Sequence, residues 1–173
     1  FDDGPTPKVT NFILKVLKKN NIKATFFCVG NKIEKHPDII KKINNEGHVI
    51  GNHSYSHING FKTSTKKYLK DISKCQELIP NTKIFRPPYG KITPMQIRKL
   101  KQDFKIIMWD VMAYDFSNRL TQEECLLNVT DNVENGSIIV LHDNLKSFEK
   151  IKHILPKIID QLKDRKFNFS EIW

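Results

Sequence analysis

Strand-like and helix-like stretches alternate along nearly the whole chain, and this alternation restricts the fold more than any other feature. Short runs rich in β-branched and aromatic residues are typical of buried strands, whereas longer runs with apolar residues three or four positions apart are typical of amphipathic helices. We predict strands at 23–29, 48–51, 83–85, 104–111, 137–141 and 167–172. We predict helices at 9–20, 37–47, 68–79, 94–100 and 148–162, with a further helix that opens at 121. An alternation of this kind predicts an α/β fold with mostly parallel strands.

Several predicted helices carry recognisable signals in their sequences. Thr93 precedes Pro94, and threonine is a favoured capping residue while proline fits the first turn of a helix. Thr121 is followed three residues later by Glu124, which is the spacing of a capping box. Pro156 falls inside the last predicted helix, where it is a candidate for a kink. The two threonines therefore fix where two of the helices begin.

Length and charge narrow the class of protein. At 173 residues, we expect a single domain that spans residues 1–173. No apolar run approaches the roughly 20 residues that a membrane-spanning helix needs, so we predict no transmembrane segment. The formal net charge of +10 suits attraction to a polyanion. The lysines are scattered over predicted helix faces without interleaved aromatic residues, however, and this favours solvated helix surfaces over a nucleic-acid partner.

The three cysteines, Cys28, Cys75 and Cys125, lie far apart in the sequence and show no CxxC spacing. This spacing argues against a zinc site made of thiolates and against a disulfide framework, although it leaves one disulfide open. We expect Cys28 and Cys75 to be small buried residues.

Five segments with polar side chains fall at the ends of predicted strands or in the loops that follow. They are 1–5 (FDDGP), 53–57 (HSYSH), 86–90 (RPPYG), 109–115 (WDVMAYD) and 139–143 (IVLHD). In a β/α barrel the carboxyl ends of the strands form the rim on which active sites are built. The placement of the five segments therefore predicts one site that is assembled from distant parts of the chain.

A metal site is the first chemistry that these segments indicate. His53 and His57 are four residues apart, and on a helical turn both imidazoles face one side at a spacing that holds one metal ion. Such a pair is commonly surface decoration, but here the adjacent carboxylates of Asp2 and Asp3 follow another strand end. Two histidines and one aspartate leave a coordination position open, as catalytic sites do. Zinc is the expected divalent ion, and cobalt, nickel or iron suits the same ligands.

The same segments contain candidates for acid–base chemistry. Neighbouring residues of an extended segment point to opposite sides, so one aspartate of the Asp2–Asp3 pair is not expected to bind the metal and also act as the base. His142 ends an aliphatic strand, and its ordinary pKa near 6.5 suits a general acid, with a structural barrel-end histidine as the alternative. Arg86 lies in a segment stiffened by two prolines, and an ordinary arginine in a surface turn is the alternative there.

In their order and spacing, the five segments resemble the polysaccharide deacetylase family, the NodB homology domain of carbohydrate esterase family 4. The resemblance covers essentially the whole chain. It implies a distorted (β/α) barrel of about seven strands, including a first strand that would precede Phe1.

The resemblance assigns a role to most residues of the predicted site. It makes Asp3, His53 and His57 the metal ligands and Asp2 the general base. Arg86 would hold Asp2 through its guanidinium, which can form two parallel hydrogen bonds to a carboxylate. This contact would keep the carboxylate ionised and oriented.

The remaining roles concern the acid and the acetyl group. By resemblance, Asp115 pairs with His142 and raises its pKa, while the backbone N–H of Tyr89 contributes to the oxyanion site. Trp109 and Leu141 match positions that wall the acetyl pocket, although either could equally be part of the core.

The function implied is that of a metal-dependent hydrolase that removes N-acetyl groups from amino sugars of a peptidoglycan-like or chitin-like polysaccharide and releases acetate. Family habit places such enzymes outside the cytoplasm, at the cell envelope. The alternatives are an O-acetyl xylan esterase, a hydrolase of non-sugar amides or imides, and an inactive glycan-binding module. The intact set of predicted ligands and acid–base residues argues against the last. One departure is Phe116, where the family usually has tryptophan, so the resemblance does not fix the details of the substrate groove.

Overall fold

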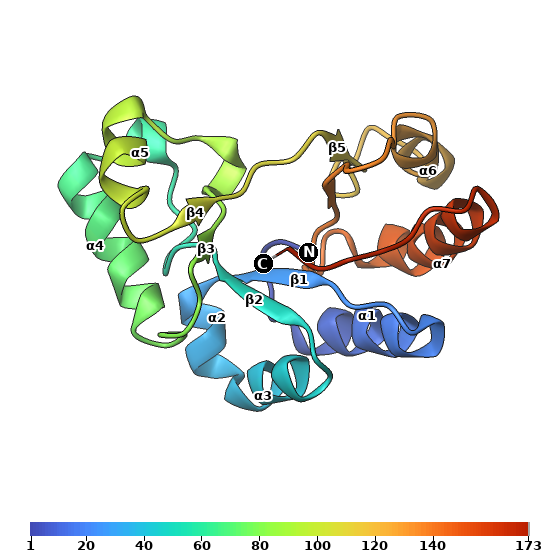
Figure 1. The fold of residues 1–173 in the computed structure, drawn as a ribbon, viewed down its shortest axis with the longest axis horizontal. Coiled ribbons are helices and arrows are strands. Elements are labelled where there is room, and N and C mark those ends of the chain that lie inside the picture. The colour runs from blue at the N-terminus through green and yellow to red at the C-terminus, as the bar shows by residue number, and fades with distance from the viewer. Residues whose placement is uncertain (173) are drawn as a thin grey trace.

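The computed structural model describes residues 1–172, and helices and short parallel strands alternate along them. The helices are α1 (Pro7–Asn20), α2 (Gly30–Lys35), α3 (Pro37–Asn45), α4 (Thr65–Gln76), α5 (Pro94–Leu100), α6 (Gln122–Thr130) and α7 (Phe148–Asp164). The strands are β1 (Thr25–Cys28), β2 (Val49–Asn52), β3 (Ile84–Phe85), β4 (Lys105–Ile106), β5 (Val111–Met112) and β6 (Ile139–Val140). Two single-turn 3₁₀ helices, η1 (Gly60–Lys62) and η2 (Pro88–Gly90), lie in the loops. Figure 1 shows the helices around the outside of the strands.

All pairings between the strands are parallel. One sheet has the order β1-β2-β3-β4, and a second pairs β5 with β6. Asp2 joins the two sheets, because it forms a parallel bridge to Phe27 on one side and to His142 on the other. The predicted α/β fold with parallel strands is therefore confirmed, and the N-terminal segment lies between β1 and β6.

The closed barrel is not confirmed by this topology. Within residues 1–172 no strand pairing joins β4 to β5, so the predicted strand 104–111 is in fact two short strands with different partners. The cause is Arg86, whose Nε donates to the carbonyl of Ile107 at 3.2 Å and whose Nη2 donates to the carbonyl of Met108 at 3.1 Å. A side chain thus occupies carbonyls that a neighbouring strand would otherwise use. The strand implied before Phe1 lies outside the described residues.

The predicted last strand at 167–172 is wrong. These residues run without regular structure, and Ile172 donates its N–H to the side-chain hydroxyl of Thr25 at 2.8 Å instead of to a backbone carbonyl. The edge of β1 that does not pair with β2 is occupied by the N-terminal segment, because the Phe27 N–H donates to the carbonyl of Phe1 at 2.8 Å. The segment instead packs Phe167 and Phe169 against the core.

The helix predictions are confirmed, with one omission. The short helix α2, which begins at Gly30 directly after β1, was not predicted. The helix α7 continues through Pro156 to Asp164. The cap expected at Thr93 and the capping box expected at Thr121 both form, because each hydroxyl accepts a backbone N–H from the third residue of its helix. The structure shows a capping box at Thr93 as well, since the Gln96 side chain accepts the Thr93 N–H. Within residues 1–172, no helix has the length and apolar character that crossing a membrane requires.

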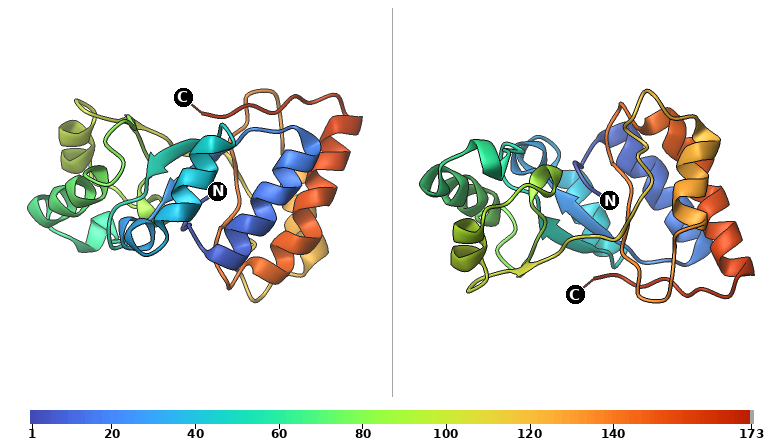
Figure 2. Two further views of the ribbon diagram at one scale, coloured as in Figure 1. Left: turned by 90° about the horizontal axis from the view of Figure 1, so that it is seen from below. Right: turned by 90° about the horizontal axis from the view of Figure 1, so that it is seen from above.

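The core lies between the strands and the helices around them. The largest cluster joins apolar faces of α1, α6 and α7 to β1, and Figure 2 shows α1 and α7 side by side. A second cluster joins α4, β3 and α5. Its buried residues are Tyr68, Ile72, Phe85 and Leu100. The three cysteines are buried and free, as expected for Cys28 and Cys75, which settles the open question of a disulfide.

We predict that Thr121→Ala destabilises the fold by about 1 kcal/mol, because it removes the hydroxyl that caps α6. The free energy of unfolding in urea measures this loss. Ser64→Ala is the matched control, since Ser64 stands at the same position before α4 but its side chain makes no capping hydrogen bond. Equal losses in the two variants would contradict the assignment of the capping energy to Thr121.

Candidate active site

Asp2 and Arg86 form a buried ion pair at the carboxyl ends of the strands. Asp2 Oδ1 lies 2.8 Å from Arg86 Nη1, and the two residues are 4% and 1% exposed. The backbone of Asp2 is fixed as well, because its N–H donates to the carbonyl of Leu141 at 3.0 Å and its carbonyl accepts the N–H of Asp143 at 2.6 Å. The guanidinium lies over the ring of Phe27, 4.2 Å from its centroid. The carboxylate is thus held rigidly on one side of the site.

The environment of Asp2 favours its charged form. Burial alone would raise the pKa of the carboxyl, since it withdraws the charge from water. The Arg86 guanidinium, with His53 adding to it, outweighs burial and holds the pKa of Asp2 below its ordinary value of 3.8. Asp2 is therefore an ionised carboxylate at neutral pH.

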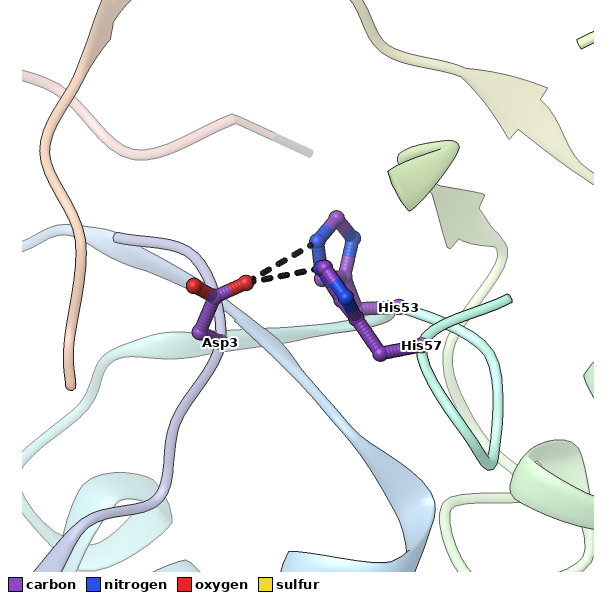
Figure 3. A group of neighbouring side chains, drawn as sticks. All are labelled: Asp3, His53 and His57. Atoms are coloured by element: carbon purple, nitrogen blue, oxygen red, sulfur yellow. Dashed lines mark ion pairs between the residues drawn. The ribbon is translucent and has the colours of Figure 1, made fainter. Parts of the chain in front are cut away.

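Asp3, His53 and His57 converge on one point. The Nε2 atoms of His57 and His53 lie 3.0 Å and 3.6 Å from the same atom, Asp3 Oδ1. The three donor atoms all lie within 4.8 Å of one another, and Figure 3 shows both imidazoles directed at the carboxylate. Asp3 comes from the N-terminal segment and both histidines from the loop after β2. One oxygen and two nitrogens in this arrangement can hold a divalent metal ion.

Hydrogen bonds to the other ring nitrogens set the tautomers of the two histidines. His53 Nδ1 lies 2.7 Å from the carbonyl of Arg86, and a carbonyl only accepts, so Nδ1 carries the proton. The lone pair of His53 Nε2 is then free to face Asp3. His57 Nδ1 lies 3.1 Å from the hydroxyl of Tyr89, which supports the same tautomer when Nε2 serves as a ligand. The donor set therefore fits a metal ion.

The two histidines converge for a different reason from the one that their spacing suggested. Residues 53–57 do not form a helical turn, and Ser54 and His57 have φ values of 60° and 55°. The loop is held by Asp71 of α4, whose Oδ1 accepts the backbone N–H groups of Tyr55 and Ser56 at 2.8 and 2.9 Å. The spacing indicated that the two imidazoles lie together, but a loop and not a helical turn brings them together.

Asp3 has two supporting partners that sequence reasoning missed. Asn144 Nδ2 donates to Asp3 Oδ2 at 2.8 Å, which leaves Oδ1 to face the histidines. Lys32 Nζ donates to the backbone carbonyl of Asp3 at 2.7 Å. These contacts hold Asp3 at a φ of 77°, a conformation that residues other than glycine seldom adopt. No sequence signal links residue 144 to residue 3, because the two lie at opposite ends of the chain.

His142 is held by Asp115 through two atoms. Its ring Nδ1 lies 2.7 Å from Asp115 Oδ1, and its backbone N–H donates to Asp115 Oδ2 at 2.8 Å. Burial disfavours the charged imidazole, but the Asp115 carboxylate outweighs burial and raises the pKa of His142 above its ordinary value of 6.5. The ring of Phe116 packs edge-on against the imidazole at 4.8 Å between centroids. The imidazole is thus positioned to be a proton donor near neutral pH.

The three residues expected around the acetyl group also lie here. Leu141 is buried and gives its carbonyl to the N–H of Asp2. Trp109 lies half-buried, with its ring centroid 5.7 Å from the Arg86 guanidinium. Tyr89 is exposed, with a φ of 60° and its ring 4.6 Å from that of His57. All three therefore neighbour the ion pair or the metal ligands.

Asp143, which follows His142, lies neither in a turn nor at the cap of a helix. Its side chain is fully buried, and its Oδ2 accepts the hydroxyl hydrogen of Thr10 at 2.7 Å. The residue that precedes α7 is Ser147.

Comparison with known proteins agrees with this arrangement. A model of the family described as "Polysaccharide deacetylase" matches residues 1–105. The chain belongs to this family. It is 40% identical to a peptidoglycan-N-acetylglucosamine deacetylase of Bacillus cereus, over 98% of the chain and 64% of that protein. It is 34% identical to the peptidoglycan-N-acetylmuramic acid deacetylase PdaC of Bacillus subtilis, over 93% of the chain and 35% of that protein.

A solved structure of the family extends the likeness to three dimensions. The crystal structure of the Bc1960 peptidoglycan N-acetylglucosamine deacetylase, in complex with an N-hydroxybenzamide compound, superposes with a TM-score of 0.94 at 38% identity. The match covers 99% of this chain and 83% of that one. The fold of this chain is thus the fold of a polysaccharide deacetylase. The chain spans about two thirds of the length of the Bacillus cereus relative and about one third of the length of PdaC.

We predict that Asn144→Ala weakens zinc binding about 10-fold to 100-fold, because Asp3 Oδ2 loses the partner that orients the carboxylate. Titration against a chelator of known affinity measures the dissociation constant. Asn144→Asp should also weaken binding, because its carboxylate cannot donate to Asp3 Oδ2 although it can still accept the Ser147 N–H. Lys146→Ala, an exposed change in the same loop, is the control. Unchanged zinc affinity in both Asn144 variants would contradict this role.

We predict that Asp115→Asn lowers the pKa of His142, because the imidazolium loses both a charge-assisted hydrogen bond and a nearby negative charge. The chemical shift of the imidazole followed by NMR against pH measures the change. The signal of His153, which lies on α7 beside Lys157, is an internal control in the same spectra. A pKa that stays the same or rises would refute the assigned cause.

Proposed function

We propose that this chain is a metal-dependent hydrolase that removes N-acetyl groups from amino sugars of a glycan and releases acetate. The observation that carries the proposal is the placement of an ionised carboxylate and a histidine of raised pKa around one candidate metal site. Asp2 is held by Arg86, and His142 is held by Asp115. Hydrolysis of an amide needs a group that removes a proton from water and a group that gives one to the amine.

Asp3, His53 and His57 would hold the metal ion, and their donor atoms fit one. A divalent ion bound there would supply Lewis-acid polarisation of the acetyl carbonyl and would lower the pKa of a water molecule. We propose zinc, because two imidazoles and one carboxylate suit it, and cobalt, nickel or iron as ions that the same donors accept.

Asp2 is the proposed general base. It takes the proton of the attacking water at a carboxylate oxygen, and Arg86 keeps that carboxylate charged and oriented before the reaction begins. The backbone N–H of Tyr89 is the proposed donor to the acetyl oxygen as negative charge develops on it. A preorganised donor of this kind stabilises the transition state by roughly 3–4 kcal/mol.

His142 is the proposed general acid. The nitrogen that leaves the acetyl group must gain a proton to depart as an amine, and the raised pKa of His142 favours the protonated imidazole that can give it. Asp115 fixes the ring, so that Nε2 is the atom directed away from the carboxylate and available to the substrate. Activity should therefore fall as the pH rises through the pKa of His142.

The proposed substrate is an N-acetylated glycan of the peptidoglycan type. The relatives support this choice, because they are deacetylases of N-acetylglucosamine or N-acetylmuramic acid in peptidoglycan. The corresponding place of action is outside the cytoplasm, at the cell envelope. Leu141 and Trp109, beside the ion pair, are the proposed apolar wall around the acetyl methyl group.

The experiment that tests the proposal measures acetate released from N-acetyl-chitooligosaccharides by zinc-loaded protein. A His53→Ala variant, which lacks one metal donor, is the control. Release by the natural sequence that disappears in the variant is the expected result. A protein that binds one zinc ion but releases no acetate would argue against the proposal and would favour an ester or a non-sugar amide as substrate.

We predict that Asp2→Asn lowers turnover at least about 100-fold, because the side chain can no longer accept a proton. Zinc affinity should change little, since Asp3 and the two histidines remain. The rate of acetate release and the zinc dissociation constant are the two measurements. Turnover within a few-fold of the natural sequence would rule out Asp2 as the base.

A further inference from the structure

The positive charge of the chain is concentrated in two segments. Residues 59–70 and 87–102 carry eight lysine or arginine side chains and no aspartate or glutamate. The whole chain has 29 basic and 19 acidic side chains, so these eight leave 21 basic and 19 acidic side chains elsewhere, and the charges elsewhere nearly cancel. The two segments therefore account for eight of the ten net positive charges. Together they form the basic lobe of the protein.

Hydrogen bonds and packing join the two segments of the basic lobe into one unit. The Gly60 N–H donates to the carbonyl of Lys91 at 3.1 Å, and the buried side chain of Gln96 donates to the carbonyl of Gly60 at 2.9 Å. The Nζ atom of Lys91 lies 5.4 Å from the centroid of the Phe61 ring. The helices α4 and α5 also pack together, and Figure 1 shows both on one side of the molecule, away from α1 and α7.

Exposed apolar side chains lie among the charges of the basic lobe. Phe61, Met95 and Ile97 are 61%, 53% and 39% exposed. In α5 the buried residues are Gln96 and Leu100, so Met95 and Ile97 are left facing solvent. Apolar side chains that are exposed as a group mark an interaction site more often than isolated ones do. The basic side chains around them are exposed as well: Lys62, Lys66, Lys67, Lys70, Lys91, Arg98, Lys99 and Lys101.

A surface of this composition suits an anionic lipid bilayer. The headgroup layer presents phosphate groups, which attract lysine and arginine side chains. The boundary between the headgroups and the acyl chains accepts apolar side chains such as phenylalanine. A soluble polyanion would match the positive charges but would leave the exposed apolar side chains in water. The lack of acidic residues in the sequence of the lobe also suits a negatively charged surface, which repels carboxylates.

We propose that the basic lobe is a docking surface for a bilayer that contains anionic phospholipids. The three apolar side chains of the lobe enter the headgroup region, and its basic side chains bind the lipid phosphates. The lobe begins two residues after His57 and includes Tyr89, so docking holds the candidate active site near the bilayer surface. The proposal does not depend on the proposed function, because it concerns binding to lipid and no chemical step.

Sedimentation with vesicles tests the charged part of the docking surface. The protein is mixed with vesicles of phosphatidylcholine alone, or of phosphatidylcholine and phosphatidylglycerol in equal parts, and the bound fraction gives an apparent dissociation constant. Binding is expected to the mixed vesicles only, and it should weaken as the salt concentration rises. The double change Arg98→Gln and Lys99→Gln should weaken binding about 10-fold to 30-fold, since one basic residue near an anionic surface contributes about fivefold.

Phe61→Ser tests the apolar part and should weaken binding to the mixed vesicles about threefold to tenfold, because part of one apolar side chain stays in water. Leu127→Ser is the matched control, since Leu127 lies on α6 and is 44% exposed. The control for charge is the double change Lys15→Gln and Lys18→Gln, which removes two exposed lysines from α1. Both controls should bind within about twofold of the natural sequence, because charges beyond a Debye length are screened.

Three results would overturn the docking surface. The first is no binding to the mixed vesicles. The second is an equal loss in the lobe variants and their controls, which would show attraction by net charge alone. The third is a loss in the Arg98 and Lys99 variant with none in Phe61→Ser, which would favour a soluble anionic polymer as the partner. Circular dichroism of each variant checks that these exposed substitutions leave the fold intact.

Discussion

One buried ion pair holds the candidate site together. Arg86 places its guanidinium against Asp2, between the N-terminal segment and β3, and also binds the carbonyls of Ile107 and Met108. Its own carbonyl accepts the proton of His53, so the same residue orients a metal ligand. A buried charge is costly unless it is paired and hydrogen-bonded, and each half of this pair satisfies that condition for the other. Arg86, which follows β3, therefore links the N-terminal segment and the residues after β4 through its side chain, and the loop after β2 through its carbonyl.

The two adjacent aspartates show how the backbone separates two tasks. Asp2 lies in the bridge between β1 and β6 and meets Arg86, whereas Asp3 turns away at a φ of 77° and meets the two histidines. The turn is stabilised from outside, by Lys32 on the carbonyl and Asn144 on the carboxylate. Ser54, His57 and Tyr89 are also left-handed, so several residues in this strained conformation lie at the site. Such conformations persist where neighbouring contacts over-determine them, and here those contacts direct ligands inward.

The sequence predicted what depends on local patterns and on strand ends. Periodicity located the helices and their caps, and the order of five segments brought Asp2, Asp3, His53, Arg86 and His142 to one edge. The predictions failed where distant contacts override local preference. Hydrogen bonds to Asp71 hold residues 53–57 in a loop instead of a helical turn, and Arg86 divides residues 104–111 into two strands. Asn144 contacts Asp3 across 141 residues, a relation that no local pattern encodes.

A buried carboxyl that does not take part in the proposed reaction completes the charge balance. Asp143 is fully buried, and beyond the hydroxyl of Thr10 its Oδ1 has no partner among the described residues, so burial raises its pKa to about 7. Near neutral pH much of the Asp143 carboxyl is uncharged, which limits its repulsion of the Asp2 carboxylate. The two residues are neighbours, because the N–H of Asp143 donates to the carbonyl of Asp2. In the unfolded chain the same carboxyl ionises near 3.8. Because the folded state then holds the proton more tightly, Asp143 lowers stability as the pH rises from about 3.8 to about 7. The fold thus loses stability at neutral pH at a residue whose uncharged form adds no negative charge beside the proposed base.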